Sequence, residues 1–492
     1  MGEELGALNV IFTEFYFWVT VVMMFLIHVG FAVYEVGVAR RKNIRATLMK
    51  NIMVIPVVTI TFFLFGWYLY FALPNGPGIT GGIIPEAVDL GAPWSESMGP
   101  NMQDRINGVF WAAFLLFSWT AASIVSGAII ERVRLGAFLI FAVLLGSITW
   151  IIDAAWGWSP NGWMVQIMGY HDAYASGVIH AVAGGTALAV LIVLGPRIGK
   201  FGPNGEVREI KPHNVWMTCV GLLLIYTGFW GFYAACNIPI LDVGGDSGSF
   251  FSATNIYLMP TTLSGITFNF LMSLSGGMMA AFVLSKADPF WTLSGGLAGI
   301  ITASAGNDLY HPLQAMLIGA AGVVVAYKLH YYVERRFRID DAVGAVAVHG
   351  YAGFFGVVVA GFVLWGYPAA APVEAGSAWF NTPEGFPAIN PLGNLLGAII
   401  MFGVLGFLPA FGVAKLLNRF GLLRVPRAVE LAGLDTHRYG NAYPYFQTSE
   451  AEGGFEDEER IIARELNQRV GGRLDGAEPS GSLSREDRRA LK

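Results

Sequence analysis

Long runs of apolar residues dominate the chain, and short polar segments separate them. Eleven of these runs are long enough to cross a bilayer core of about 30 Å as helices. Their approximate limits are 11–37, 52–74, 108–130, 135–156, 173–195, 214–236, 258–285, 290–306, 311–333, 342–366 and 391–417. The eighth run is short, so a tilted or partly non-helical span is expected there. The pattern predicts an all-α polytopic membrane protein with eleven transmembrane helices.

The distribution of basic residues predicts the orientation of these spans. With eleven spans, the two termini lie on opposite sides of the membrane. All 30 Lys and Arg residues except Arg105 lie in or beside the connections on one side, or in the C-terminal segment. Because positively charged loops stay in the cytoplasm, the N-terminus is predicted outside and the C-terminus inside. We divide the chain into a membrane domain at 1–419 and a cytoplasmic tail at 420–492, with a short helix expected at 456–470.

Composition supports the membrane assignment and excludes other classes. Hydrophobic residues make up 54% of the 492 residues and charged residues only 13%, whereas soluble proteins carry about a quarter charged residues. The 62 Gly residues suit closely packed membrane helices. These figures exclude a disordered, nucleic-acid-binding or ordinary cytosolic protein. The net charge of −5 is too small to indicate a polyanionic partner.

Two segments share one pattern. DAYASGVIHAVAGG begins at Asp172 and DAVGAVAVHGYAGF begins at Asp341, and in both a His follows the Asp by eight positions. The segments are five spans apart, so the second crosses the membrane in the opposite sense. This is the pattern of an inverted-topology repeat. We place repeat one at about 11–195, repeat two at about 214–366 and an added eleventh helix at about 391–417.

The repeat predicts a meeting of two histidines near the bilayer midplane. Eight residues at the helical rise place His180 and His349 each about 12 Å deep, from opposite faces. A two-fold axis in the membrane plane would bring them within hydrogen-bond distance. Three interpretations stay open: separate core histidines bonded to carbonyls, a metal site that lacks an obvious third ligand, and a pore lined by neutral imidazoles. Intramembrane polar residues usually line a pathway, which favours the pore.

The acidic residues of the repeat have a structural role available. A carboxylate at a helix N-terminus caps free N–H groups and meets the positive end of the helix dipole. Capping suffices for Asp341. Asp172, at the predicted outer mouth, can also stabilise an entering cation.

Aromatic residues gather in the same spans. Phe117 and Phe232 fit ordinary core packing, and the tryptophans of the outer loop fit an interface belt. An indole face also attracts an ammonium ion. The tryptophans in question are Trp156, Trp158 and Trp163.

Five ordered motifs resemble those of the ammonium transporters, the Amt/Mep/Rh family, over about residues 15–446. The motifs are GFAVYEVGVARRKN in the first span, SGAIIERVR at 126–134, DAYASGVIH, IDDAVGAVAVHG and the post-membrane stretch LLRVPRAVELAGLDTHRYGNAY. The resemblance implies eleven helices in two inverted halves and a homotrimer with one pore per subunit; we expect no cofactor. It also implies a PII-type regulatory protein as a possible partner at the cytoplasmic face.

The resemblance assigns roles to single residues. His180 and His349 are similar to the twin pore histidines, and Asp172 to the acidic residue behind the outer site. Phe117 and Phe232 stand at the two gate positions. Trp156 best matches the tryptophan that recruits ammonium, although Trp158 and Trp163 stay open because this stretch is longer than in many members.

The sixth span departs from the family pattern. It reads GFWGFYAAC, so Phe229 stands where a site tryptophan is common and Cys236 where a site serine is common. Tyr233 replaces an Asn. A phenyl ring attracts cations less than an indole, and sulfur accepts hydrogen bonds poorly. We therefore expect a differently tuned outer ammonium site that still includes Phe229 and Cys236. In the tail, HRYGNAY lacks the family's usual glutamate.

Together these features predict a plasma-membrane transporter of ammonium or ammonia rather than an enzyme. Two alternatives stay open: a non-conducting ammonium sensor on the same fold, and a channel for another small solute such as methylamine or carbon dioxide.

Overall fold

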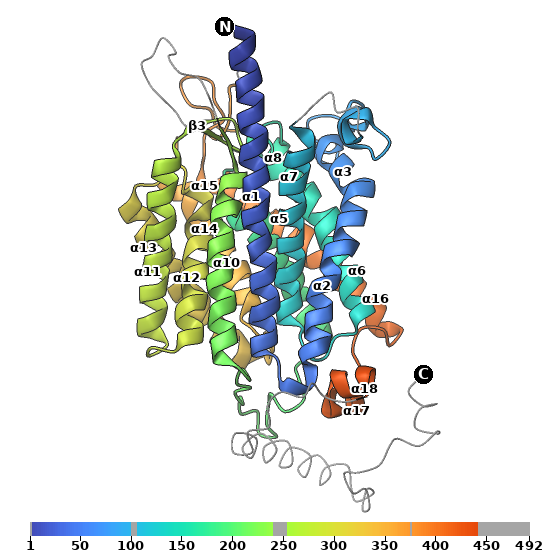
Figure 1. The fold of residues 1–492 in the computed structure, drawn as a ribbon. Coiled ribbons are helices and arrows are strands. Elements are labelled where there is room, and N and C mark those ends of the chain that lie inside the picture. Colours follow the sequence, from blue (N-terminus) through green and yellow to red (C-terminus); the bar gives the residue numbers. More distant parts are fainter. Residues whose placement is uncertain (1, 100–105, 240–252, 374–375, 441–492) are drawn as a thin grey trace, which may run out of the picture.

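The structure is a computed structural model that describes residues 2–99, 106–239, 253–373 and 376–440. Within these residues, ten helices are long and apolar enough to cross a membrane. They run side by side as one bundle, with the N-terminus at one end and the short helices α17 and α18 at the other (Figure 1). The helix predicted at 456–470 lies outside the described residues.

Most predicted spans match one helix or a helix interrupted by a π-helical turn. The described segments are α1 (Gly2–Val38), α2, η2 and α3 (Ile44–Thr61, Phe62–Gly66 and Trp67–Ala72), α5 (Asn107–Ala128), α6, η4 and α7 (Leu135–Leu144, Leu145–Thr149 and Trp150–Gly157), η5 and α9 (Ser176–Ala181 and Val182–Leu194), α10 (Val215–Ala235), α11 (Leu263–Leu284), α12 (Pro289–Ala303), α13 (Pro312–Phe337), η7 and α14 (Val346–Tyr351 and Ala352–Val363), and α15, η8 and α16 (Pro391–Ile399, Ile400–Phe407 and Leu408–Arg419).

The eighth predicted run, 290–306, corresponds to α12 and the 3-10 turn η6 (Ser304–Gly306). With 15 residues, α12 is too short to count among the ten candidate spans, although it packs between α11, α13 and α14. The structure therefore supports about ten spans, and the number eleven stays a prediction, as do the inverted repeat and the orientation.

Polar residues at the helix starts explain several boundaries. Asn214, Thr262, Asp288 and Asn390 each accept a hydrogen bond from a backbone N–H in the first turn of α10, α11, α12 and α15. Pro follows directly at the start of α12 and α15, where its missing N–H costs nothing. Local sequence thus determines where these helices begin.

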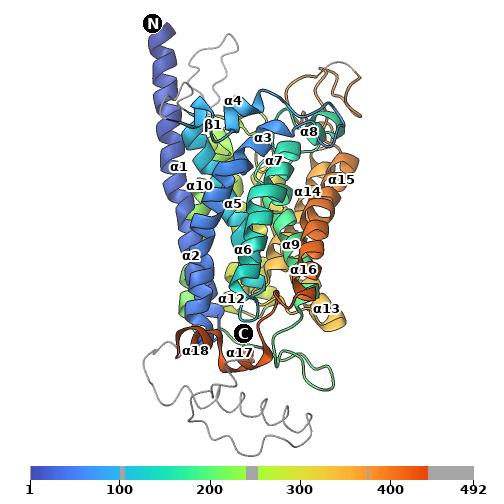
Figure 2. The same cartoon turned by 90° about the vertical axis from the view of Figure 1, so that its right-hand side faces the viewer.

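Short elements cover the two ends of the bundle. The remaining elements are η1 (Arg41–Asn43), α4 (Ala87–Gly91), η3 (Glu96–Met98), α8 (Trp163–Met168), α17 (Arg427–Ala432), α18 (Leu434–Tyr439) and the strands β1 (Asn237–Pro239), β2 (Ala253–Asn255) and β3 (Pro260–Thr261). The strands form one antiparallel sheet in the order β1-β2-β3, with Asn237 opposite Asn255. Seen from the side, α17 and α18 lie below α2 and α6 (Figure 2).

Candidate functional site

Asp172 caps the half-helix formed by η5 and α9. One carboxylate oxygen accepts the N–H of Ser176 at 2.7 Å, and the other accepts those of Gly177 at 2.7 Å and Val178 at 2.9 Å. The Tyr170 hydroxyl donates to the same carboxylate at 3.1 Å. Burial raises the pKa of Asp172, while these donors oppose the shift. The predicted capping role is confirmed, and it uses most of the acceptor capacity of the carboxylate.

Asp341 repeats this arrangement at the start of η7 and α14. Its carboxylate accepts the N–H groups of Ala345 at 2.9 Å and Val346 at 2.8 Å. Three positions after each Asp, the backbone takes the left-handed conformation, at Ala175 with φ 70° and at Gly344 with φ 70°. Two segments far apart in the sequence therefore begin their helices in the same way.

The two histidines of the repeat meet inside the bundle. Nδ1 of His180 lies 3.0 Å from Nδ1 of His349, and the ring centroids are 5.1 Å apart. Both residues are buried, His180 in η5 and His349 in η7. The prediction that they approach within hydrogen-bond distance is confirmed. Nε2 of His180 is buried and has no hydrogen-bond partner among the described residues.

Glycines let the two half-helices cross closely enough for this contact. A Cβ at Gly184 would lie 2.2 Å from Cα of Gly350, and a Cβ at Gly353 would lie 2.2 Å from the carbonyl oxygen of Ser176. Gly184 and Gly353 each stand twelve positions after the Asp that opens their half-helix. Any larger residue would push the backbones apart.

Stacked aromatic rings lead to the histidine pair from one side. The rings of Phe117 and Phe232 meet edge-on with their centroids 4.7 Å apart, and the ring of Phe232 stacks on that of His180 with a centroid distance of 5.6 Å. Phe229 stacks on Phe232 at 4.8 Å and on His180 at 5.9 Å. All four rings are buried. The structure thus brings three of the phenylalanines singled out in the sequence into one column beside the pair.

The three tryptophans at 156–163, in and between α7 and α8, separate into two locations. Trp158 is fully buried, meets Phe117 edge-on at 4.9 Å and donates Nε1–H to the carbonyl of Ala173 at 3.3 Å. Trp156 instead contacts Trp163 at 5.8 Å. The indole that touches the phenylalanine column is therefore Trp158, while recruitment by Trp156 stays a prediction.

The unusual residues of the sixth span are accommodated by local contacts. Sγ of Cys236 donates to the carbonyl of Phe232 at 3.2 Å, which turns the thiol back onto its own helix. Tyr233 stacks on Tyr174 at 4.3 Å and its hydroxyl lies 2.6 Å from that of Ser304. The paired tyrosines bring together the sixth span and the start of the first half-helix, a contact that spacing alone does not predict.

A small cavity adjoins the histidine pair at His349. It has a volume of about 20 Å³ and is lined by His349, Tyr34 and Glu35, among others. This volume holds about one water-sized molecule. One oxygen of Glu35 accepts from Asn51 at 2.9 Å and Ser126 at 2.7 Å, and the other has no hydrogen-bond partner among the described residues.

Sequence reasoning missed two intramembrane carboxylates, Glu35 and Asp153. Asp153 lies in α7, is fully buried, and neither of its oxygens has a hydrogen-bond partner among the described residues. The rarity of acidic residues within membrane helices is the signal that would have found both.

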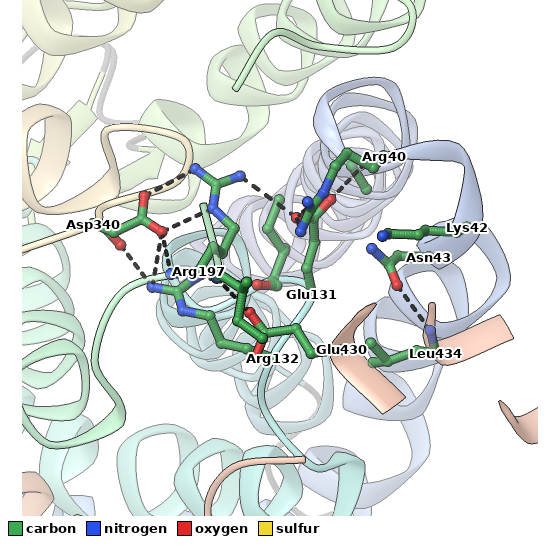
Figure 3. A network of polar contacts seen from close by, with 12 residues as sticks. Arg40, Lys42, Asn43, Glu131, Arg132, Arg197, Asp340, Glu430 and Leu434 are labelled. Atoms are coloured by element: carbon green, nitrogen blue, oxygen red, sulfur yellow. Dashed lines mark hydrogen bonds and ion pairs between the residues drawn. The ribbon is translucent and has the colours of Figure 1, made fainter. Parts of the chain in front are cut away.

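An ionic network holds the ends of the half-helices at the base of the bundle (Figure 3). Arg197 makes a bidentate pair with Asp340 at 2.8 and 2.9 Å, and Arg132 donates to the Asp340 carbonyl at 2.6 Å. Glu131 pairs with Arg40 at 2.7 Å and lies 3.7 Å from Arg197. Burial alone would raise the pKa of Glu131, but Arg40 and Arg197 lower it to about 2. These groups are therefore charged at neutral pH.

The post-membrane segment is attached to this network. Glu430 pairs with Arg424 at 2.8 Å and accepts the N–H of Ile198 at 2.8 Å. Asp435 accepts the N–H groups of Arg45 and Ala46 at the start of α2, at 2.9 and 2.8 Å. Short helices α17 and α18 are thereby joined to both the first half-helix and α2.

Comparisons with known proteins agree on one group. The sequence model of the Ammonium Transporter Family matches residues 14–443. Relatives include the ammonium transporter Amt2 of Archaeoglobus fulgidus, 28% identical over 87% of this chain and 88% of its own length. Amt2 of Haloferax mediterranei is also 28% identical, over 89% of this chain and 91% of its own.

Solved structures share the fold. A protein described as "Sensor Amt Protein" superposes with a TM-score of 0.70 at 22% identity, over 88% of this chain and 99% of its own. Candida albicans Mep2 superposes with a TM-score of 0.66 at 18% identity, over 88% and 91%.

Proposed function

We propose that this chain, which belongs to the Ammonium Transporter Family, carries ammonium across the plasma membrane as ammonia, through a pore lined by His180 and His349. Its relatives are named as transporters, and about ten apolar helices make it a multi-pass membrane protein. The observation that carries the proposal is the buried histidine contact of 3.0 Å at the crossing of two half-helices.

Charge is the physical problem that this pore solves. Moving a bare cation into a dry, low-dielectric passage costs tens of kcal/mol in the idealised limit. Neutral ammonia avoids most of that cost. The column of buried phenylalanines excludes water and ions, so the solute that passes it is uncharged.

The histidine contact makes the pair amphoteric toward ammonia. One Nδ1–H donates a hydrogen bond to the other Nδ1, so the two neutral rings hold opposite tautomers. The two Nε2 atoms then offer one donor and one acceptor. Ammonia both donates and accepts hydrogen bonds, and the unpartnered Nε2 of His180 provides a contact for it.

Recruitment takes place outside the phenylalanine column. Ammonium is attracted by the indole faces of Trp156 and Trp158, while Phe229 lies inside the column, against Phe232 and His180. It loses its proton before the Phe117–Phe232 contact, whose rings rotate to let ammonia pass. Asp172 acts mainly as the cap that holds the first half-helix, and its negative charge adds to the potential at the mouth.

Orientation and assembly follow the same proposal. The basic end of the bundle faces the cytoplasm, so α17 and α18 lie inside the cell. The chain forms a homotrimer, and a PII-type protein binds at the cytoplasmic face. The network around Asp340 and Glu430 connects that face to the half-helices that carry the histidines.

Transport by purified protein in liposomes tests the proposal. Uptake of methylammonium and ammonium-induced current are measured for wild type, His180→Ala and His349→Ala. Each substitution should abolish uptake or reduce its selectivity over potassium. His311→Asn is the matched control, because it removes an imidazole at a helix N-cap where Asn replaces the acceptor. Unchanged uptake and selectivity in both pore variants would contradict the proposed pore.

A sensor is the second candidate function. The altered sixth span and the fold likeness to the "Sensor Amt Protein" favour it. A sensor would bind ammonium with wild-type folding but show no uptake in the same liposomes. Measured uptake by the wild-type chain decides for the transporter.

A further inference from the structure

A pocket of about 580 Å³ opens at the basic end of the bundle, away from the histidine pair. Its walls come from α2, α6 and α16, and the post-membrane segment with α17 and α18 closes its far side. In Figure 2, α18 and α17 lie below α2 and α6, two of the helices that form these walls. The pocket is thus bounded by membrane helices on one side and by the docked C-terminal segment on the other.

The cations that remain available in this pocket are Arg134 and Arg438. Both are exposed and line the pocket. Arg134 donates Nε–H to a carbonyl, and Arg438 lies over a tyrosine ring. Within the described part of the chain, neither forms an ion pair with a carboxylate. The charge offered to a ligand is therefore positive.

The other charged residues of the pocket are already neutralised. Lys50 donates to the carbonyl of Ser126 at 2.5 Å and lies 3.5 Å from Glu35. Glu131 is held by Arg40 and Arg197. The carboxylate that reaches the pocket therefore does not cancel the two arginines.

The start of α6 adds a second feature that favours an anion. This ten-residue helix begins at Leu135, its N-cap position is Arg134, and no side chain caps it. Gly136, in its first turn, is exposed and lines the pocket. Free N–H groups and the positive end of the helix dipole then lie beside the arginine.

Most of the remaining lining is apolar and comes from the membrane helices and the post-membrane segment. Ile140 of α6 is 46% exposed, and Leu417 of α16 lines the same wall. Leu422, 51% exposed, also lines the pocket. An inorganic phosphate would use only the charged half, whereas a molecule with an anionic head and an acyl chain would use both.

We propose that this pocket binds one anionic phospholipid of the cytoplasmic leaflet. The phosphate lies between Arg134, Arg438 and the start of α6, and one acyl chain follows Ile140 and Leu417. Basic pockets between membrane helices on the cytoplasmic side suit such headgroups. The bound lipid bridges α6 to α18 and so stabilises the docked C-terminal segment. This proposal depends on the orientation proposed above, and not on the pore mechanism.

The acidic tail is the competing occupant. Four acidic residues follow α18 within about twenty residues: Glu456, Asp457, Glu458 and Glu459. Their charge is complementary to that of the two arginines. The apolar half of the pocket gives these carboxylates nothing to bind, which is why the lipid is favoured.

The experiment measures the melting temperature of the full-length protein in detergent while lipid is added. Dioleoylphosphatidylglycerol should raise the melting temperature of wild type, and dioleoylphosphatidylcholine should not. Arg134→Gln/Arg438→Gln should weaken the apparent phosphatidylglycerol affinity about 25-fold, because each basic residue near an anionic lipid contributes about 1 kcal/mol. The matched control, Arg335→Gln/Arg336→Gln, removes two exposed charges from the end of α13, outside the pocket.

Three outcomes would overturn the proposal. Equal loss of affinity in both double variants would mean that only the general charge of the surface matters. An equal temperature rise with inorganic phosphate would make the pocket a phosphate site. In a full-length variant, the four tail carboxylates are replaced by Gln or Asn. If phosphatidylglycerol raises the melting temperature only in this variant, the pocket is assigned to the tail. Failure of the lipid effect leaves the transport assay unaffected, so the two proposals are tested separately.

Discussion

Replacing Gly184 with Ala should separate the half-helices that hold the histidine pair. The added Cβ would lie 2.2 Å from Cα and 2.4 Å from the backbone N of Gly350. Both neighbours are main-chain atoms, so no side chain can rotate away to make room. The helices themselves must move.

The structure gives the size of that movement. Ordinary contact begins at 3.4 Å, so the crossing has to open by about 1.2 Å, the difference from 2.2 Å. The His180–His349 contact of 3.0 Å would then lengthen to about 4 Å, beyond hydrogen-bond distance. Overpacking of this kind costs about 1–3 kcal/mol. The better helix propensity of Ala offsets up to about 1 kcal/mol of that cost.

Melting temperature and methylammonium uptake in liposomes measure the two consequences. We expect Gly184→Ala to melt below wild type and to lose uptake or selectivity. The matched control is Gly412→Ala in α16, where no described residue outside the local helix backbone lies within 4 Å of the added Cβ. This control should melt at or above the wild-type temperature and transport normally. Wild-type melting and uptake in Gly184→Ala would refute the reasoning that close backbone contact sets the histidine distance.

Three further predictions concern the residues around the pair and the network. Asp172→Asn should lower stability by about 2–3 kcal/mol, because an amide replaces a carboxylate that accepts three backbone N–H groups; chemical denaturation measures the loss. Glu131, with its pKa lowered from 4.5 to about 2, stabilises the fold above about pH 4.5 and loses this contribution as the pH falls toward 2. The melting temperature of wild type should therefore fall as the pH is lowered across that range. Glu131→Gln should have a lower melting temperature at neutral pH and should lack this part of the decrease. Trp158→Leu should raise the half-saturation for uptake more than Trp156→Leu does, because Trp158 contacts the phenylalanine column; an equal or reversed effect would return the recruiting role to Trp156.

The sequence predicted the histidine contact because its determinants are local and repeated. The helical rise predicts the depth of each His below its Asp, and the odd number of predicted spans between the copies predicts opposite directions for the two segments. From these two features we predicted that His180 and His349 meet, and the structure shows their contact at 3.0 Å. Capping by Asp172 and Asp341 was predictable for a similar reason, since a carboxylate at a helix start binds the next few N–H groups of its own chain.

Contacts between segments that are distant in sequence were decided only by the tertiary structure. Trp156 and Trp158 are two positions apart in the sequence, which does not distinguish them. Only the packing against α5 shows that Trp158, and not Trp156, contacts Phe117. The pairing of Glu131 with Arg40, and of Arg197 with Asp340, joins separate connections at one end of the bundle. Their charge was visible in the sequence, but Coulomb attraction depends on distance and burial. Distance and burial exist only once the helices have packed, and for that reason the network and the pocket beside it come from the fold rather than from any motif.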